Sequence, residues 1–166
     1  MKLADVEAIL RGLNDAEVRY LIVGGLAVVA HGYVRATMDI DIVLGLEESN
    51  ARHAMEALTV IGYRPLVPVD ALDFANPEMR RTWHTEKNMI VFQMRHPDRD
   101  STRLDIFVKE PFPFSDELAK AKWETVAGIR APVLCLERLL QMKRESGRPQ
   151  DLADVEQLIL IAKNRT

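Results

Sequence analysis

Hydrophobic residues recur every three or four positions in several stretches of the chain, which is the spacing of a helix with one buried face. Near the start the pattern is carried by Leu3, Val6, Ile9, Leu10 and Leu13. Similar spacing, bounded by Gly, Pro or acidic residues, predicts further helices over 26–31, 47–62, 135–146 and 150–163. Shorter helices are expected at about 70–75, at 77–86 and from Ser115. Helical segments are therefore expected along the whole chain.

Short runs of β-branched and aromatic residues lie between these helices and predict strands. The expected strands cover 20–23, 39–44, 63–65, 88–95, 102–108, 124–127 and 129–133. The polar residues 96–101 separate two of them, which predicts an antiparallel pair, and Gly128 marks a second turn. Strands that alternate with helices in this way indicate an α/β protein, with a mixed sheet, flanking helices and two C-terminal helices.

The composition is that of a single domain covering residues 1–166. Hydrophobic residues make up 48% of the chain, which at this length is enough to bury a substantial core. The longest apolar stretch, 20–30, is interrupted by two glycines and is too short to cross a membrane. Asp5 and Glu7 stand where a secretory signal would need basic and apolar residues, so we expect a cytoplasmic protein without a membrane partner. The net charge of −3 gives no general basic surface for nucleic acid.

Two carboxylates interrupt the apolar run of the strand over 39–44. Side chains of a strand alternate between faces, so Asp39 and Asp41 share one face while Ile40 and Ile42 occupy the other. Two like charges side by side destabilise a strand unless something compensates them. The usual compensator is a divalent cation, which prefers carboxylate oxygens and often also holds substrate phosphates. On its own, the motif is better explained by a half-exposed strand with a polar outer face, because Asp-x-Asp triplets are common by chance.

A pair of glycines precedes this motif. Gly24 and Gly25 directly follow the strand over 20–23 and stand at the start of the helix over 26–31. Glycine lets the backbone approach an anion closely, and the free N–H groups at a helix start point at it. The order of strand, Gly-Gly, helix and Asp-x-Asp strand therefore predicts a site for phosphate and metal.

These motifs resemble the DNA polymerase β-type nucleotidyltransferase superfamily, whose signature is an apolar residue, Gly, then Gly or Ser, a spacer and Asp-apolar-Asp. The family has a third carboxylate on a later strand, for which Asp105 is the counterpart here. Arg35 and Thr37, spaced ahead of the Asp-x-Asp motif, are more particularly similar to the small bacterial branch that includes AbiEii-type toxins. One departure is Gly25, where many members have Ser, so that residue offers no hydroxyl to a phosphate oxygen.

Polar residues also mark the junction of the last two helices. Lys143 continues the apolar stripe of its helix and is expected to point inward. In the following helix Asp151 lies one turn ahead of the apolar stripe and Asp154 lies off it. That stripe is expected to consist of Leu152, Val155, Leu158, Ile159 and Ala162. A lysine at a helix C-terminus and an aspartate at an N-terminus suit the helix dipole, so capping alone explains both. The resemblance gives an alternative to capping. In the toxin-like branch, such a Lys and an Asp-Leu-x-Asp segment complete the nucleotide site, and here Arg148 lies between the two.

The resemblance implies a nucleotidyltransferase that moves a nucleoside monophosphate from a nucleoside triphosphate (NTP) to a hydroxyl acceptor. Asp39, Asp41 and Asp105 would be the catalytic residues and would hold two Mg²⁺ ions, and Asp105 could instead take the acceptor proton. The nucleotide-binding residues that it implies are Gly24, Gly25, Arg35, Thr37, Lys143, Arg148 and Asp151. The acceptor stays open between RNA, protein and a small molecule.

Three biological roles fit these residues. The first is an enzyme of a toxin–antitoxin system, with an antitoxin or toxin as partner. The second is an enzyme of the same fold that modifies a hydroxylated antibiotic. The third is a nucleotide-binding or antitoxin-like protein without turnover. The segment 143–154 favours the first role over the second, and the presence of all three carboxylates argues against the third.

Overall fold

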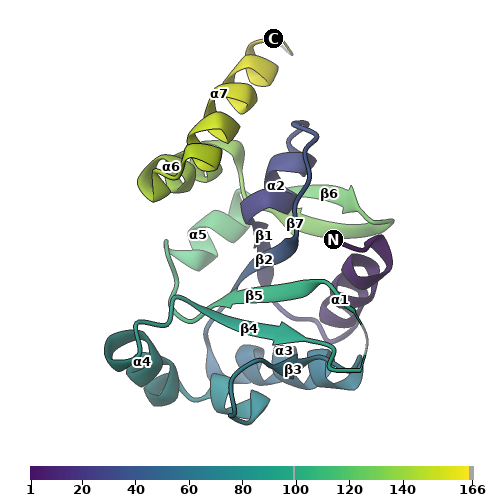
Figure 1. The fold of residues 1–166 in the computed structure, drawn as a ribbon, viewed down its shortest axis with the longest axis vertical. Coiled ribbons are helices and arrows are strands. Elements are labelled where there is room, and N and C mark those ends of the chain that lie inside the picture. The colour runs from purple at the N-terminus through teal and green to yellow at the C-terminus, as the bar shows by residue number, and fades with distance from the viewer. Residues whose placement is uncertain (99, 165–166) are drawn as a thin grey trace.

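One mixed sheet of seven strands organises the computed structural model, which describes residues 1–98 and 100–164. The strand order across the sheet is β3-β4-β5-β2-β1-β7-β6. The strands are β1 (Tyr20–Val23), β2 (Asp39–Leu44), β3 (Arg64–Pro65), β4 (Val91–Arg95), β5 (Arg103–Phe107), β6 (Lys122–Val126) and β7 (Ile129–Val133). The pairs β2–β5 and β1–β7 are parallel, and the other neighbours are antiparallel. The expected α/β class with a mixed sheet is confirmed (Figure 1).

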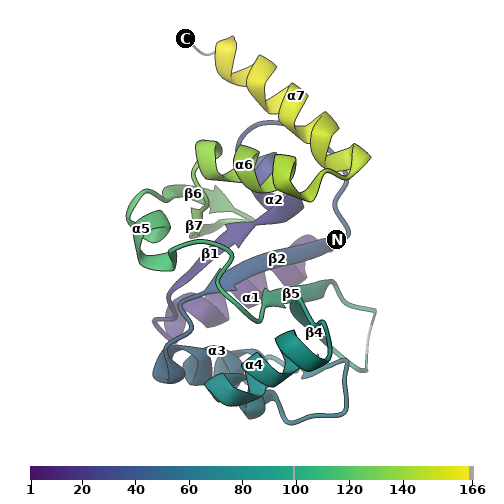
Figure 2. The same cartoon turned by 90° about the vertical axis from the view of Figure 1, so that its left-hand side faces the viewer.

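The helices surround this sheet. They are α1 (Leu3–Asp15), α2 (Gly24–Ala30), α3 (Glu48–Val60), the 3₁₀ helix η1 (Ala71–Ala75), α4 (Pro77–Glu86), α5 (Phe114–Ala119), α6 (Leu136–Ser146) and α7 (Pro149–Lys163). Helices α1 and α3 pack against each other, whereas α6 and α7 lie together at the opposite end of the molecule, beside α2 (Figures 1 and 2). Within the described residues, none of these helices is both long and apolar enough to cross a membrane.

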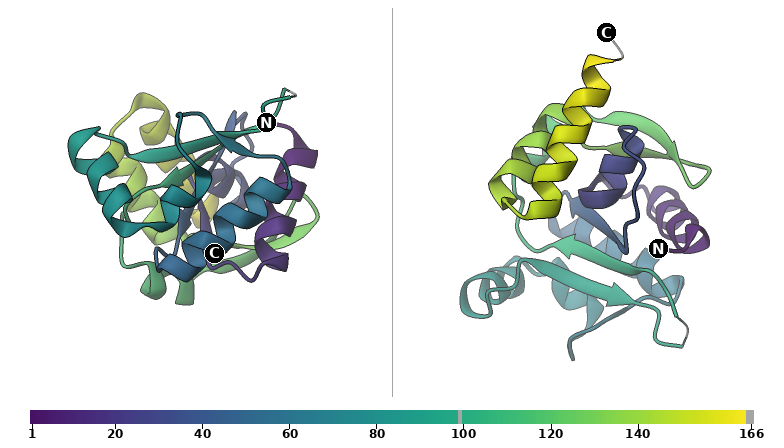
Figure 3. Two further views of the ribbon diagram at one scale, coloured as in Figure 1. Left: turned by 90° about the horizontal axis from the view of Figure 1, so that it is seen from below. Right: turned by 45° about the horizontal axis from the view of Figure 1, so that its top comes forward.

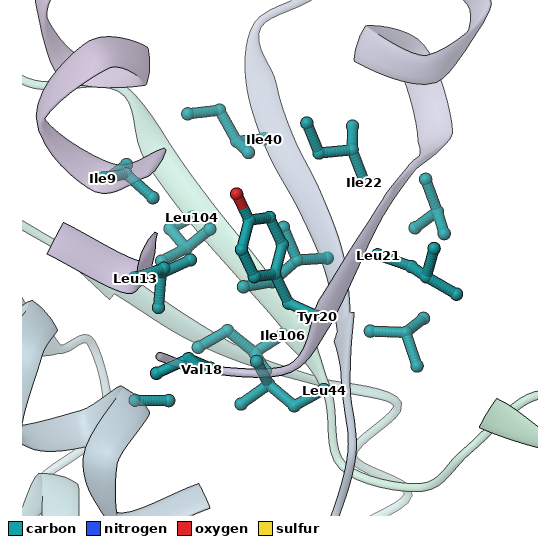
Figure 4. Packing of buried hydrophobic residues seen from close by; sticks show 14 of the residues in the cluster. Ile9, Leu13, Val18, Tyr20, Leu21, Ile22, Ile40, Leu44, Leu104 and Ile106 are labelled. Atoms are coloured by element: carbon teal, nitrogen blue, oxygen red, sulfur yellow. The ribbon is translucent and has the colours of Figure 1, made fainter. Parts of the chain in front are cut away.

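The core lies between the sheet and the helices packed on it, among them α1 and α3. Tyr20 and Ile22 of β1 alternate with Leu21 and Val23, and all four side chains are buried. Figure 4 shows Tyr20 among core residues of α1, β2 and β5, with Leu21 on the other side of its strand. The residues labelled around Tyr20 are Ile9, Leu13, Val18, Ile22, Ile40, Leu44, Leu104 and Ile106. Ile40 and Ile42 are fully buried, so the polar face of β2 is left for Asp39 and Asp41.

Several element boundaries differ from the expected ones for local reasons. Strand β4 begins at Val91 rather than at 88, because Asn88 has a φ of 51° and the Met89 N–H bonds to the Trp83 carbonyl at the end of α4. Strand β6 begins at 122, two residues earlier than expected, and the hairpin turns at Ala127 and Gly128, both with positive φ. Helix α2 begins at Gly24 itself.

The inner face of α7 was predicted correctly at Val155 and Leu158 but wrongly at Leu152 and Asp154. Leu152 is 45% exposed, and the buried positions of α7 are Asp151, Asp154, Val155 and Leu158. Asp154 was expected off the stripe, but it is fully buried. The reason is electrostatic, since Asp154 faces Arg35 and Lys143, and these ion pairs set the rotation of the helix. Lys143 points inward as expected and is 7% exposed.

Candidate active site

Three carboxylates gather on one face of the sheet because β2 and β5 are parallel neighbours. Asp39 and Asp41 are two residues apart on β2 and therefore share a face. In the register of the pair, Asp41 lies beside Asp105 and Asp39 lies beside Arg103. Residues paired across neighbouring strands point to the same side, so Asp105 joins the two carboxylates of β2. The structure therefore places the three acidic residues together, although they come from segments far apart in the sequence.

Burial and mutual repulsion raise the pKa values of Asp41 and Asp105 in this cluster. Burial raises the pKa of Asp41 from 3.8 to about 6, with further contributions from the charges of Asp39 and Asp105. The Lys143 ammonium and the backbone N–H of Gly25 oppose this shift. Burial likewise raises the pKa of Asp105, although hydrogen bonds from Gln93 and Arg103 work against it. A cluster with these pKa values would be stabilised by an added cation.

Arg103 lies between two of the carboxylates. Its Nε donates to Asp105 Oδ1 at 2.9 Å, and its Nη2 donates to Asp39 Oδ2 at 2.5 Å. Gln93 of β4 donates its side-chain amide to both oxygens of Asp105, at 3.3 and 3.2 Å. With the side chains arranged in this way, no three Asp, Glu, His or Cys side chains of residues 1–98 and 100–164 converge on one point that an ion could occupy.

The two glycines make room for the side chains of the site. Gly24 has a φ of 61°, and a Cβ on it would lie 2.0 Å from Asp41 Oδ2. A Cβ on Gly25 would lie 2.4 Å from the hydroxyl oxygen of Thr37. The Gly25 N–H also points at the Asp41 carboxylate. The Gly-Gly pair is therefore needed for the close approach of β2 and of residue 37 to the start of α2.

Thr37 supplies a hydroxyl next to the position where many superfamily members have Ser. Its Oγ1 lies where the side chain of residue 25 would begin, and it donates to the Asp39 carbonyl at 3.3 Å. The hydroxyl that Gly25 lacks is thus present at the same end of α2, carried by a neighbouring segment.

A network of buried charges joins α6 and α7 to the segment before β2. Arg35 forms a two-pronged pair with Asp154, with Nε and Nη2 at 2.6 and 2.8 Å from the two carboxylate oxygens. Lys143 Nζ contacts Asp154 at 2.8 Å and Asp151 at 2.5 Å. Ser146 donates to the other Asp151 oxygen at 2.6 Å. Burial alone would raise the pKa of Asp151 and of Asp154, but the hydrogen bonds from these cations bring both below the ordinary value.

All the residues that the sequence assigned to the site line one cavity of about 800 Å³. These are Gly24, Gly25, Arg35, Thr37, Asp39, Asp41, Asp105, Lys143, Arg148 and Asp151. The walls are completed by α6 and by the strands β4 and β5, and Figure 3 shows α6 and α7 beside α2 at this end of the molecule. The cavity falls within the roughly 300–1,000 Å³ typical of small-molecule sites.

Three residues of the site were not assigned to it from the sequence. Arg103 shares a face with Asp105, since the two are two positions apart on one strand, and this signal was available. Asp154 was recognised in the motif, but it was left out of the nucleotide-binding set because its helix stripe was misplaced. Gln93 carries no motif, and only the β4–β5 register places it beside Asp105.

The fold is that of known nucleotidyl-transferring enzymes. A lincosamide antibiotic adenylyltransferase bound to lincomycin superposes with a TM-score of 0.63 at 18% identity, covering 95% of this chain and 96% of that one. The antibiotic-resistance factor ANT(2'')-Ia in solution gives 0.60 at 14% identity, covering 99% and 84%. The same enzyme in complex with adenylyl-2''-tobramycin gives 0.57 at 15% identity, covering 99% and 89%. The chain has the nucleotidyltransferase fold. No family model and no curated protein sequence matches it.

The nucleotidyltransferase fold implies a divalent metal and an NTP, and the donor set of this chain fits the metal. Asp39, Asp41 and Asp105 offer only carboxylate oxygens, which Mg²⁺ prefers. Burial, and after it the charges of Asp39 and Asp105, raise the pKa of Asp41, and a bound cation would oppose both effects. If the Arg103 guanidinium moved away, Asp39 Oδ2 and Asp105 Oδ1 would be available to a metal ion.

Proposed function

We propose that the protein is a Mg²⁺-dependent nucleotidyltransferase that moves a nucleoside monophosphate from an NTP to a hydroxyl acceptor. The observation that carries the proposal is the parallel β2–β5 register, which sets Asp105 beside Asp41 on the face shared with Asp39. Two or three carboxylates on adjacent strands, next to a glycine-lined helix start, form a site for a metal-bound phosphate chain. The fold of the antibiotic adenylyltransferases supports the same reaction class.

The three carboxylates would bind the metal ions, and one of them could also accept a proton. Asp39, Asp41 and Asp105 would hold two Mg²⁺ ions, which when bound neutralise the triphosphate and stabilise an in-line displacement at the α-phosphorus. Asp105 lies at the buried end of the cluster with a raised pKa, so it is also suited to accept the acceptor's hydroxyl proton at a carboxylate oxygen.

The phosphate chain would be bound by the start of α2 and the cations of the cavity. Gly24 and Gly25 allow backbone approach, and Thr37 adds a hydroxyl beside them. Arg148 lies at the N-cap of α7 and lines the same cavity, where its fork can pair with phosphate oxygens. Lys143 and Arg35 are held by α7 carboxylates, so they contribute positive charge from fixed positions. Asp151 binds the Lys143 ammonium and keeps it there.

Two acceptor classes follow from separate observations. A toxin-like enzyme, with RNA or protein as acceptor and an antitoxin partner, is favoured by the resemblance carried by Arg35, Thr37 and the 143–154 segment. A small hydroxylated antibiotic is favoured by the two similar adenylyltransferases and by a cavity of about 800 Å³ whose wall includes the apolar side chains of Ile90, Phe107 and Met142. Both classes use the same nucleotide site.

A transfer assay tests the reaction and separates the acceptors. The protein is incubated with Mg²⁺ and each of the four common NTPs labelled at the α-phosphate, together with lincomycin, tobramycin, total RNA or total protein. Pyrophosphate release with label on one acceptor is expected, and Asp41→Asn should abolish it while circular dichroism shows an intact fold. Labelling that persists at the same rate in Asp41→Asn would reject the proposed site.

A further inference from the structure

Among the described residues, Arg103 is the only cation that forms ion pairs with the carboxylates of β2 and β5. Its guanidinium forms ion pairs with two of the three carboxylates, at 2.9 Å to Asp105 and 2.5 Å to Asp39. Lys143 and Arg35 also line the cavity, but their ion pairs are with α7 carboxylates, and Lys143 acts on Asp41 through its charge. Arg103 is 43% exposed at its side chain, whereas Asp105 is 9% exposed, so the arginine covers the cluster from the solvent side.

A guanidinium and a divalent metal compete for the same oxygens. Asp39 Oδ2 and Asp105 Oδ1 each accept a bond from Arg103, and a metal shared by the two residues would bind oxygens of the same two carboxylates. Arginine stays charged at every physiological pH, so it does not give up these bonds by losing a proton. It can leave only by rotating its long side chain toward solvent, which its partial exposure allows.

Resting on the proposed function, we propose that Arg103 is the resident counter-ion of the carboxylate cluster and that a metal ion bound with nucleotide displaces it. The arginine lowers the affinity of the free protein for metal alone, because a metal must first break two charge-assisted bonds. A metal–NTP complex brings its own anionic phosphates, which offer the released guanidinium a new bidentate partner. Arg103 thus acts as a positioning residue that couples metal binding to nucleotide binding.

Mn²⁺ titration of the protein without nucleotide tests this, with free Mn²⁺ followed by electron paramagnetic resonance. Arg103→Ala should bind Mn²⁺ about tenfold to a hundredfold more tightly than the original chain, the range expected for losing one to two charge-assisted bonds. Arg103→Gln keeps part of the side chain without its charge and should shift the affinity in the same direction. Arg81→Ala is the matched control, because it removes the same charge from an exposed pair on α4 outside the cavity.

The outcomes test the role of Arg103 and the proposed function separately. An affinity for Mn²⁺ that is unchanged in both Arg103 variants, or raised equally in Arg81→Ala, overturns the role of Arg103. Adding Asp41→Asn to Arg103→Ala separates this result from the proposed function. If that double variant keeps the full Mn²⁺ affinity, the metal does not bind at the carboxylates and the proposed function itself fails. If it loses Mn²⁺ binding while Arg103→Ala alone changes nothing, only the counter-ion role is rejected.

Discussion

Two independent features of the structure require glycine at position 24. Its φ of 61° is costly for any residue with a Cβ, and that Cβ would lie 2.0 Å from the Asp41 carboxylate. Gly24→Ala should therefore lower the free energy of unfolding by more than the roughly 1–2 kcal/mol of the left-handed backbone alone. Gly128 provides the matched control, because its φ is 79° and nothing lies within 4 Å of its Cβ position. Urea denaturation of both alanine variants measures the difference, and equal losses would show that Asp41 does not crowd residue 24.

Asp41 should make the protein less stable as the pH rises. Its pKa in the folded protein is about 6, raised by burial and then by Asp39 and Asp105, against 3.8 for an ordinary aspartate. A folded-state pKa above the unfolded value gives stability that is complete below about pH 4 and is lost as the pH rises through about 6. Asp41→Asn should remove this loss and raise stability above pH 6 by at most about 3 kcal/mol.

Urea denaturation across this pH range, in a chelator, is the measurement. Asp41→Asn and the original chain should have similar stability near pH 4 and diverge as the pH increases. Parallel curves for the two proteins would contradict the raised pKa of Asp41.

The acidic residues of the site could be predicted from sequence, but their environment could not. Alternation along a strand is enough to put Asp39 and Asp41 on one face. The partner of Asp41 across the sheet depends on the β2–β5 register, and a shift of that register by one residue would remove Asp105 from the site. For the same reason the contact between Arg103 and Asp39, 64 positions apart, appears only in the structure.

Among the elements, α6 and α7 are joined by buried ion pairs as well as by apolar packing. Lys143 is held by two carboxylates of α7, and Asp154 is fully buried. Lys143→Met leaves these carboxylates with less compensating charge in the protein interior. The free energy of unfolding should therefore fall by about 3–5 kcal/mol, the usual effect of breaking a buried ion pair by removing one partner.

Arg81→Met is the matched control for this prediction, since the Arg81–Glu78 pair is 70% exposed on both sides. Exposed ion pairs contribute little to stability, so the control should leave the urea midpoint nearly unchanged. A loss of only a few tenths of a kcal/mol in Lys143→Met would support simple capping of α6 by its C-terminal lysine instead.

Element type was predictable from the sequence wherever one face of an element is clearly apolar. The stripe of α1 predicted its buried face, and α6 ends at the expected position 146, directly before Gly147 with its φ of 65°. Helix α7 differs because apolar residues occupy more than one of its faces, with Leu152 and Leu160 about half exposed. Apolar spacing could not choose between those faces, and the buried ion pairs of Asp154 decided the outcome.

At the scale of the whole molecule, the sheet order joins distant segments into one site. Strand β5 enters between β4 and β2, and β1 separates β2 from the hairpin of β6 and β7. Element order along the chain predicted a mixed sheet, but it could not predict this arrangement, because crossover connections are compatible with several strand orders. The superposition over nearly the full chain on a lincosamide antibiotic adenylyltransferase and on an antibiotic-resistance factor establishes the arrangement as the nucleotidyltransferase fold.

We propose that the NTP binds through a metal ion held by the carboxylates of β2 and β5. Isothermal titration calorimetry with ATP and GTP, in Mg²⁺ and in a chelator, tests it without knowledge of the acceptor. For at least one of the two nucleotides, binding should be strong in Mg²⁺ and weak in the chelator, and Asp41→Asn should remove the metal-dependent part while the fold stays intact. Equal affinity in Mg²⁺ and in the chelator, or unchanged Mg²⁺-dependent affinity in Asp41→Asn, would contradict the account.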